Sequence, residues 1–357
     1  MGDFRSFPTA ERRPASAMRP VVDPAGWGPD DLRDVSRWSY VLGKSDAAEL
    51  ESAVAAVRRA GIPLTEVTQE NFPLGAFGET LREVRRELLD GRGIVMLRGF
   101  PVLRFDREEQ AIAYLGLGAY LGDRISQNAQ GHILGHVKDL GGNYADPLTR
   151  GYTTNAEMLF HADASDYVGL LCLATSRSGG ASRVASSVTV YNRMLAHRPD
   201  LVQVLCEDFY RSRSGEVNPG EPGWFKQPIF SFTDGYFSAT GAGAAIDKAM
   251  TIAGVPPMSP AQQEAVALYR QTVEDCALDI DFQQGDIQFL NNFVMLHTRR
   301  AYDDWPDAAR KRHLLRLWLS DPNGRPIPKA QREGRSGRGV HLQGVALNAP
   351  LDVDAAA

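Results

Sequence analysis

A histidine and an aspartate near the middle of the chain have the types and spacing that can bind a metal ion. His161 and Asp163 lie two positions apart, and side chains two apart in an extended chain point to the same side. Both could therefore bind one ion. The pair alone is weak evidence, because a turn with a capping aspartate and a surface histidine has the same sequence.

A third ligand must come from elsewhere, and His297 stands out among the seven histidines. It ends an apolar, strand-like run at residues 287–296, although a histidine there could also be a hydrogen-bonded core residue. Two histidines and one carboxylate form a facial triad, which leaves positions open for the cosubstrate and O₂ of an iron(II) oxygenase. A hydrolytic zinc site can use the same ligands, so the triad by itself does not choose the reaction.

Two arginines after this histidine narrow the choice. Arg312 and Arg316 are four positions apart, so both face one side of a strand. A cosubstrate such as 2-oxoglutarate chelates iron at one end and leaves a carboxylate at the other, which the planar fork of a buried arginine matches. The alternative is ordinary ion pairing with the aspartates of the preceding loop, Asp303, Asp304 and Asp307.

The elements that must position these residues are mostly short strands. Apolar and β-branched runs bounded by Gly or Pro predict strands at residues 94–100, 167–174, 183–190, 229–232, 236–239, 280–282 and 313–319. Helical spacing of apolar residues predicts helices at residues 45–60, 77–89, 191–196, 198–206 and 260–277. The pattern favours a mainly β fold with flanking helices (α+β), a sandwich or barrel with helical buttresses.

The chain is predicted to form a single domain with a tail at each end. Residues 1–22 are rich in Arg and Pro and are expected to form a mobile N-terminal tail, residues 23–325 the domain, and residues 326–357 a loosely packed C-terminal tail. Residues 127–155 are expected to form a lid and the wall of a substrate site. The candidates for substrate contact in this segment are Gln127, Asn128, Tyr152 and Asn155.

Composition excludes several classes of protein. The chain is 43% hydrophobic and 23% charged, with a formal net charge of −5, so it is a folded protein without the signature of a nucleic-acid or membrane-surface binder. No stretch approaches the about 20 apolar residues of a membrane span, and no secretory signal is present. The three cysteines form no CxxC, which fits a reducing cytoplasm. A small-molecule substrate is favoured, and a homo-oligomer is left open.

Four motifs in order resemble the taurine dioxygenase (TauD/TfdA) family of iron(II)- and 2-oxoglutarate-dependent oxygenases. They are His161-Ala162-Asp163, then Ser178-Gly179-Gly180, then the run from Gly285 to His297, and finally Arg312-His313-Leu314-Leu315-Arg316. The similarity spans roughly residues 90–320. The resemblance implies a double-stranded β-helix (jelly-roll) core.

The resemblance also implies roles for individual residues. It makes His161, Asp163 and His297 the catalytic iron ligands, and it places Arg312 on the distal carboxylate of 2-oxoglutarate. Ser182 occupies the place of a family threonine or serine that contacts the same carboxylate. Arg316 either supports the cosubstrate or reaches an anionic group of the substrate. The loop between His297 and Arg312 is longer than in the taurine enzyme, which leaves open whether Arg312 or Arg316 is the main cosubstrate partner.

The implied function is an oxidoreductase of the 2-oxoglutarate-dependent type. Such an enzyme uses Fe(II), 2-oxoglutarate and O₂ to hydroxylate an unactivated C–H bond of a small polar metabolite, such as an amino acid or a natural-product intermediate, and releases succinate and CO₂. Desaturation or ring closure shares the same first steps. Two alternatives remain at this point: a metal-dependent hydrolase on the same triad, or a non-catalytic jelly-roll binding protein.

Overall fold

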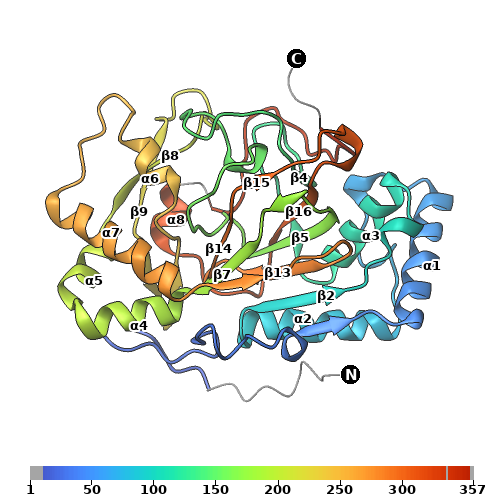
Figure 1. Ribbon diagram of the computed structural model, residues 1–357, viewed down its shortest axis with the longest axis horizontal. Coiled ribbons are helices and arrows are strands. Elements are labelled where there is room, and N and C mark those ends of the chain that lie inside the picture. Colours follow the sequence, from blue (N-terminus) through green and yellow to red (C-terminus); the bar gives the residue numbers. More distant parts are fainter. Residues whose placement is uncertain (1–10, 335–336, 354–357) are drawn as a thin grey trace.

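The computed structural model describes residues 11–334 and 337–353, and its centre is one large sheet (Figure 1). The strand order is β1-β2-β13-β5-β16-β3, with β4 also paired to β16. Only β1 and β2 are parallel, and the other pairs are antiparallel. These strands are β1 (Ser39–Val41), β2 (Ile94–Arg98), β3 (Asp123–Arg124), β4 (Gly135–Val137), β5 (Tyr167–Ala174), β13 (Ile287–Asn291) and β16 (His313–Ser320).

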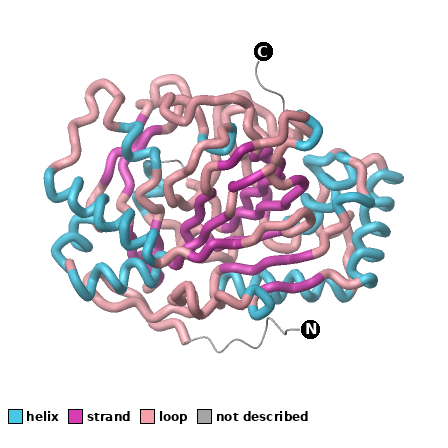
Figure 2. Tube along the Cα trace, in the orientation of Figure 1, coloured by secondary structure: helices cyan, strands magenta, loops and turns pink. Residues whose placement is uncertain are grey.

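A smaller antiparallel sheet has the order β12-β7-β14. Its strands are β7 (Ser182–Ser186), β12 (Leu278–Ile280) and β14 (Met295–Arg299). Val184 and Leu296 of this sheet belong to the same buried core as Leu170 and Leu314 of the large sheet. The two sheets therefore share one hydrophobic core, and strands form the centre of the molecule (Figure 2).

Helices lie around the sheets, and two groups can be distinguished (Figure 1). One group covers the face of the large sheet that points away from the smaller one, since its apolar residues share a second core with that face; it consists of α1 (Lys44–Ala60), α2 (Ala76–Asp90) and α3 (Arg107–Ala119). The other group packs together at the opposite end of the molecule and consists of α4 (Ser187–His197), α5 (Pro199–Leu205) and α7 (Pro260–Asp275). No helix in the described residues is long and apolar enough to cross a membrane.

The remaining elements are short. The strands are β6 (Ser178–Gly179), β8 (Phe209–Ser212), β9 (Trp224–Gln227), β10 (Phe230–Thr233), β11 (Tyr236–Ala239) and β15 (Tyr302–Asp303). The helices are α6 (Ala244–Ala249) and α8 (Lys329–Gly334), with single 3₁₀ turns at Val35–Arg37, Leu64–Glu66, Val102–Arg104, Gly151–Thr153 and Ala308–Arg310. The strands predicted at residues 229–232 and 236–239 are confirmed as β10 and β11, which pair in antiparallel fashion as a hairpin.

Strand β16 shows how the sequence positions the site. Its residues alternate between the two cores: Leu315 and Leu317 pack under the helices, while Leu314 and Trp318 face the core between the sheets. This alternation confirms the predicted strand and follows from the period-two geometry of extended chain. Arg316 lies on the same face as Leu314 and Trp318, so the strand directs a cation into an otherwise apolar interior.

Two predicted strands differ from the structure, and both differences have a local cause. The strand predicted at residues 183–190 stops at Ser186 and becomes α4, because the Ser186 side chain caps the helix by accepting a hydrogen bond from Thr189 N (3.1 Å). The run at residues 287–296 is divided between β13 and β14 in different sheets. There the Asn291 side chain accepts from Phe293 N (2.9 Å) and turns the chain. His297 therefore lies within β14 rather than after a strand.

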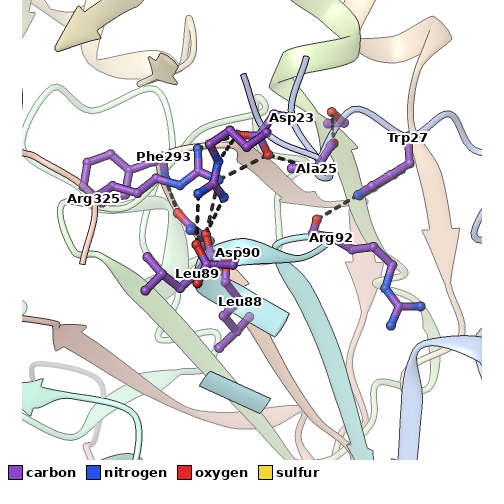
Figure 3. A network of polar contacts seen from close by, with 12 residues as sticks. Asp23, Ala25, Trp27, Leu88, Leu89, Asp90, Arg92, Phe293 and Arg325 are labelled. Carbon is purple, nitrogen blue, oxygen red and sulfur yellow. Dashed lines mark hydrogen bonds and ion pairs between the residues drawn. The ribbon is translucent and has the colours of Figure 1, made fainter. Parts of the chain in front are cut away.

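The N-terminal segment packs on the domain from residue 11 onward. Arg12 forms ion pairs with Asp23 (2.9 Å) and Asp90 (2.9 Å). Asp23 also pairs with the buried Arg325 (3.0 Å). Figure 3 shows Asp23, Asp90 and Arg325 in this network. Residues 1–10 of the predicted tail lie outside the described residues. The domain boundaries at residues 23 and 325 remain predictions.

The C-terminal segment differs from the loose packing expected for it. Arg338 and Val340 are buried. The Arg338 guanidinium forms an ion pair with Asp166 (2.7 Å) and lies 4.2 Å from the centre of the Phe293 ring. A buried ion pair and a cation–π contact fix this segment against the core, although its Gly- and Arg-rich sequence carries no periodic pattern.

Candidate metal centre and its two cavities

His161 and His297 are brought together by backbone pairing. The segment before β5 forms an isolated bridge with β14 at these two residues, with hydrogen bonds from His161 N to His297 O (3.1 Å) and from His297 N to His161 O (2.9 Å). Directly opposed residues of two strands have neighbouring side chains, and the two imidazole ring centres are 4.4 Å apart.

Asp163 completes a group that could hold a metal ion. Its carboxylate oxygens lie 4.0 Å from His161 Nε2 and 3.7 Å from His297 Nε2, and one ligand atom of each residue lies within 4.8 Å of the other two. Asn292 accepts a hydrogen bond from Asp163 N (3.1 Å) and donates to Ser165 Oγ (2.9 Å). The turn between β13 and β14 therefore positions the carboxylate.

The protonation states suit metal binding. His161 Nδ1 lies 2.9 Å from the carbonyl of Leu159; since that oxygen can only accept, Nδ1 carries the proton and Nε2 keeps its lone pair. Burial, with His161 nearby, lowers the pKa of His297 to about 3. Burial disfavours the Asp163 carboxylate, but Arg316 and both histidines outweigh this and hold its pKa below the usual range. The buried Oδ2 of Asp163 has no hydrogen-bond partner among the described residues, as expected of a ligand atom for a cation.

Arg316 is directed at the metal centre. Its Nη1 lies 3.5 Å from Asp163 Oδ1, and its Nε donates to Gln127 Oε1 (2.8 Å). Gln127 Nε2 in turn donates to the Arg316 carbonyl (2.8 Å). The guanidinium lies 4.7 Å and 4.8 Å from the ring centres of Tyr152 and Trp318. Among the described residues, Arg316 forms no ion pair with the aspartates of the loop before β16.

A cavity with about 430 Å³ of empty space, part of it open to solvent, is lined by His161 and His297 of this candidate metal centre. Its polar lining includes Arg312, Arg316 and Ser182, so the structure brings together the residues predicted to contact the cosubstrate. No acidic side chain is among the described residues that line it. A cavity lined by arginines suits a dianion such as 2-oxoglutarate. We call this space the cosubstrate cavity.

Arg312 is buried and forms no ion pair within the described residues. Its guanidinium lies 5.2 Å from the centre of the Tyr302 ring, and its Nη1 has no hydrogen-bond partner in the described part of the chain. Its backbone N–H donates to Asp304 Oδ1 (2.7 Å) of the preceding loop. Burial lowers the pKa of Arg312. Ordinary ion pairing, the alternative considered from the sequence, therefore does not explain this side chain.

The sequence reasoning missed one cation that lines the cosubstrate cavity, Arg299. It lies in β14 two positions after His297 and lines the cosubstrate cavity with Arg312. The guanidinium contacts the Tyr302 ring at 4.7 Å, and burial, together with the charge of Arg312, lowers the pKa of Arg299 to about 10. The alternation of side chains along a strand could have found it, since residues two apart share a face.

A second and larger cavity, of about 1170 Å³, adjoins the metal centre on its other side. We call it the substrate chamber. Its lining includes five cations, Arg150, Arg211, Lys248, Arg316 and Arg338. Asp163 is the one acidic residue among the described lining residues. The chamber is built from the predicted lid, the segment from β8 to α6, and the C-terminal segment.

The predicted substrate residues are distributed unevenly. Tyr152 lines both cavities, and Gln127 is buried against Arg316. Asn128 and Asn155 line neither cavity. The Asn128 side chain bonds within its own loop, where its Nδ2 lies 3.1 Å from His132 Nδ1.

Comparison with known proteins establishes the family. Residues 60–318 match the taurine catabolism dioxygenase TauD, TfdA family. FR-33289 synthase of Streptomyces rubellomurinus is 30% identical over 328 residues, which cover 89% of this chain and 96% of that protein. The taurine hydroxylase-like protein SAT17 of Stachybotrys chartarum is 29% identical over 312 residues, covering 84% of this chain and 79% of that protein.

Solved structures share the fold at low sequence identity. An asparagine oxygenase in complex with Fe(II), 2S,3S-3-hydroxyasparagine and succinate is 18% identical, with a TM-score of 0.62 over 80% of this chain and 94% of that chain. The non-haem iron oxygenase OrfP in complex with Fe and alpha-ketoglutaric acid is 16% identical, with a TM-score of 0.58 over 79% of this chain and 94% of that chain. The expected jelly-roll core is thereby confirmed.

The chain belongs to the TauD/TfdA family. It is an iron(II)- and 2-oxoglutarate-dependent dioxygenase, as the order of its motifs predicts, rather than a hydrolase or a non-catalytic binding protein. Family membership does not test the roles of individual residues.

Proposed function

We propose that this dioxygenase hydroxylates an unactivated C–H bond of a small polar metabolite that carries an anionic group, with iron held by His161, Asp163 and His297. One observation carries the proposal. One ligand atom of each of these residues lies within 4.8 Å of the other two. His161 and His297 line a cavity suited to a dicarboxylate, and His161 and Asp163 line a larger chamber with a cationic wall.

The three residues fit an iron(II) ion chemically. Two neutral imidazoles and one carboxylate are the donor set of a facial triad, which leaves positions open for a cosubstrate and O₂. Bound iron, with 2-oxoglutarate and O₂, supplies the oxidising chemistry and yields succinate and CO₂. The residues of the chain bind and orient the reactants and keep water out.

The chain's own residues divide this work. Arg312 and Ser182 bind the distal carboxylate of 2-oxoglutarate, because both line the cosubstrate cavity and Arg312 has no counter-ion within it. Arg316 positions Asp163, since its contacts with Asp163 and Gln127 occupy the face toward the metal centre. Arg312 is accordingly the main cosubstrate arginine in this proposal.

The chamber lining supports an anionic substrate. Arg338 and Lys248 approach it from different segments, and one N–H group of Arg338, Nη2, is buried without a hydrogen-bond partner in the described structure. An unpaired buried donor is unfavourable unless a ligand satisfies it. An amino acid is one candidate class, because the solved neighbours include complexes with 3-hydroxyasparagine and (3S)-hydroxy-L-Arg.

We also place the protein in the cytoplasm. The three cysteines are free, and Cys172 and Cys276 are buried. Thiols kept as small apolar core residues are typical of a reducing compartment.

The test is a screen for substrate-stimulated succinate formation. Purified protein with Fe(II), 2-oxoglutarate and O₂ is incubated with a panel of small carboxylates, amino acids, sulfonates and phosphorylated compounds, matched with neutral analogues. We expect one anionic class to raise the rate of succinate release and to gain one oxygen atom. Stimulation by neutral compounds alone would contradict the assigned substrate class, and no iron-dependent succinate release with any compound would contradict the assigned metal site.

A further inference from the structure

We propose that Arg299 is a second binding residue for the distal carboxylate of the cosubstrate, so that Arg299 and Arg312 form a two-arginine clamp. The inference rests on the proposed function, in which the cavity beside His297 receives 2-oxoglutarate. It goes beyond that function because it assigns cosubstrate binding to a residue outside the motifs of the chain.

The position of Arg299 on the sheet supports the clamp. Arg299 is the last residue of β14, two positions after His297, and its Cα is paired with that of Ser182 across the strands. Arg312 directly precedes β16 in the other sheet. All three side chains line the cosubstrate cavity, so residues of both sheets contribute to its wall.

Unpaired donors converge at this end of the cavity. Arg299 Nε and Nη1, Arg312 Nη1 and the Tyr302 hydroxyl are buried and have no hydrogen-bond partner in the described part of the chain. Within the described residues, the Arg299 side chain forms one hydrogen bond, from Nη2 to the carbonyl of Ala156. Buried polar groups are almost always bonded, so several orphan donors in one place indicate a ligand with acceptor oxygens.

The charge at this point leads to the same conclusion. The guanidinium groups of Arg299 and Arg312 lie 4.7 Å and 5.2 Å from the centre of one ring, that of Tyr302. Neither forms an ion pair within the described residues, and no acidic side chain is among those that line the cavity. Two buried like charges without a counter-ion destabilise a folded protein, and the carboxylate of a bound dicarboxylate would neutralise them. A carboxylate has two oxygens and can accept from both forks at once.

The experiment compares two ligands on wild-type protein and Arg299→Met. Fe(II)-loaded protein is titrated without oxygen by calorimetry, once with 2-oxoglutarate and once with 2-oxovalerate, in which a methyl group replaces the distal carboxylate. We expect Arg299→Met to weaken 2-oxoglutarate binding by about ten- to a hundredfold, the range of a charge-assisted hydrogen bond, and to leave 2-oxovalerate binding within about twofold. Equal losses for both ligands, or no loss for either, would overturn the clamp.

A second readout separates ligand binding from a structural role. Because Arg299 is an uncompensated buried cation, we expect ligand-free Arg299→Met to unfold at the same temperature as wild type or higher. A lower unfolding temperature with unchanged 2-oxoglutarate affinity would show that Arg299 serves only to hold the Ala156 carbonyl. Arg300→Met is the matched control, because this neighbouring arginine is exposed and pairs with Asp279 (3.1 Å); it should leave both affinities unchanged.

A conservative variant covers the case in which Arg299→Met does not fold. Arg299→Lys retains the charge but loses the planar fork, and we expect it to bind 2-oxoglutarate at least about fivefold more weakly than wild type. Wild-type affinity in Arg299→Lys would overturn a clamp that depends on the fork. Failure of wild type itself to bind 2-oxoglutarate would overturn the proposed function as well, so the two failures are distinguishable.

Discussion

The cosubstrate cavity and the substrate chamber meet at the same metal centre but are built differently. The cavity, about 430 Å³, is lined by Arg299 of β14 and by Arg312, which directly precedes β16, and neither forms an ion pair within the described residues; it shares Arg316 of β16 with the chamber. Of the other cations of the chamber, about 1170 Å³, Arg150, Lys248 and Arg338 come from a loop, a short helix and the C-terminal segment, and Arg211 comes from β8. There Arg150 and Arg338 already have carboxylate partners, Glu216 and Asp166.

The difference indicates a division between constant and variable chemistry. A cavity in which two arginines at strand ends, Arg299 and Arg312, form no ion pair within the described residues is prepared for one dianionic ligand. A chamber whose cations are partly neutralised and lie mostly outside the two sheets can change its shape without disturbing them. We therefore expect mutations in the cavity to change the cosubstrate requirement and mutations in the chamber to change the substrate requirement.

The largest effect should come from a proposed iron ligand at the point where the two spaces meet. His297→Ala removes one of the three proposed iron ligands, so we expect loss of Fe(II) binding and succinate formation at the background level, because the metal supplies the oxidising chemistry for the reaction. Binding of iron is measured by anaerobic titration, and turnover by succinate release. The fold should persist, as judged by circular dichroism.

His197→Ala is the matched control for this prediction. His197 is the last residue of α4 and lines neither cavity, so its replacement should leave iron binding and turnover unchanged. Full activity in His297→Ala would show that iron is not bound at the point where the two spaces meet.

Removing a cation of the cosubstrate cavity should have the next largest effect. We expect Arg312→Met to raise the 2-oxoglutarate concentration for half-maximal succinate formation by about a hundredfold, since a buried charge-assisted pair is lost. The KM for the substrate should stay within about twofold. If Arg316→Met shows this selective effect on 2-oxoglutarate and Arg312→Met does not, the cosubstrate arginine has been assigned to the wrong position of β16.

The sequence predicts the cosubstrate cavity better than the substrate chamber, because side chains on strands follow a regular alternation. Arg312 and Ser182 belong to or adjoin strands, where period-two alternation fixes the direction of a side chain, and the structure places both in the predicted cavity. Arg299 obeys this alternation too, but it was missed because the strand was expected to end at His297. The turn at Asn291 that starts a new strand there depends on a side-chain hydrogen bond, which periodicity does not report.

The chamber was not predictable in this way. Asn128 and Asn155 are polar residues of the expected lid, yet neither lines the chamber, because a loop has no repeating geometry that assigns a direction to its side chains. Arg338 and Lys248 line it from segments that are far from the lid in the sequence. Only the tertiary fold brings them together, through contacts such as the ion pair of Arg338 with Asp166.

A cation of the chamber should affect the substrate alone. We expect Arg338→Met to raise the KM for an anionic substrate by about tenfold, because the buried Nη2 donor is lost, and to leave the 2-oxoglutarate requirement unchanged. Steady-state rates with each ligand varied in turn provide the measurement. Arg332→Met is the control, since Arg332 is an exposed residue of the same segment. A parallel rise in both KM values would show that the two spaces are not independent.

The smallest effect on ligand binding is expected from a residue of β16 that lines neither space but belongs to the strand that supports both. His313, the first residue of β16, lies beside His136 with 2.8 Å between His313 Nε2 and His136 Nδ1, and His136 Nε2 lies 2.8 Å from the carbonyl of Pro350. Because that carbonyl can only accept, His136 donates to it through Nε2, so His136 Nδ1 must accept from His313.

Burial, with His136 nearby, lowers the pKa of His313 to about 3, against about 6.5 in an unfolded chain. Between these values the unfolded state binds a proton that the folded state does not, so stability falls as the pH decreases from about 6.5 toward 3, by up to about 1.4 kcal/mol per pH unit for one proton.

We expect His313→Gln, which retains a donor for His136, to reduce this pH dependence of the unfolding free energy by up to one proton, measured by urea unfolding of the ligand-free protein between about pH 4 and 6. The 2-oxoglutarate affinity at pH 7.5 should remain as in wild type. An unchanged pH dependence would show that the fold does not keep His313 neutral. A weaker 2-oxoglutarate affinity would show that a change at the start of β16 also alters the cosubstrate cavity.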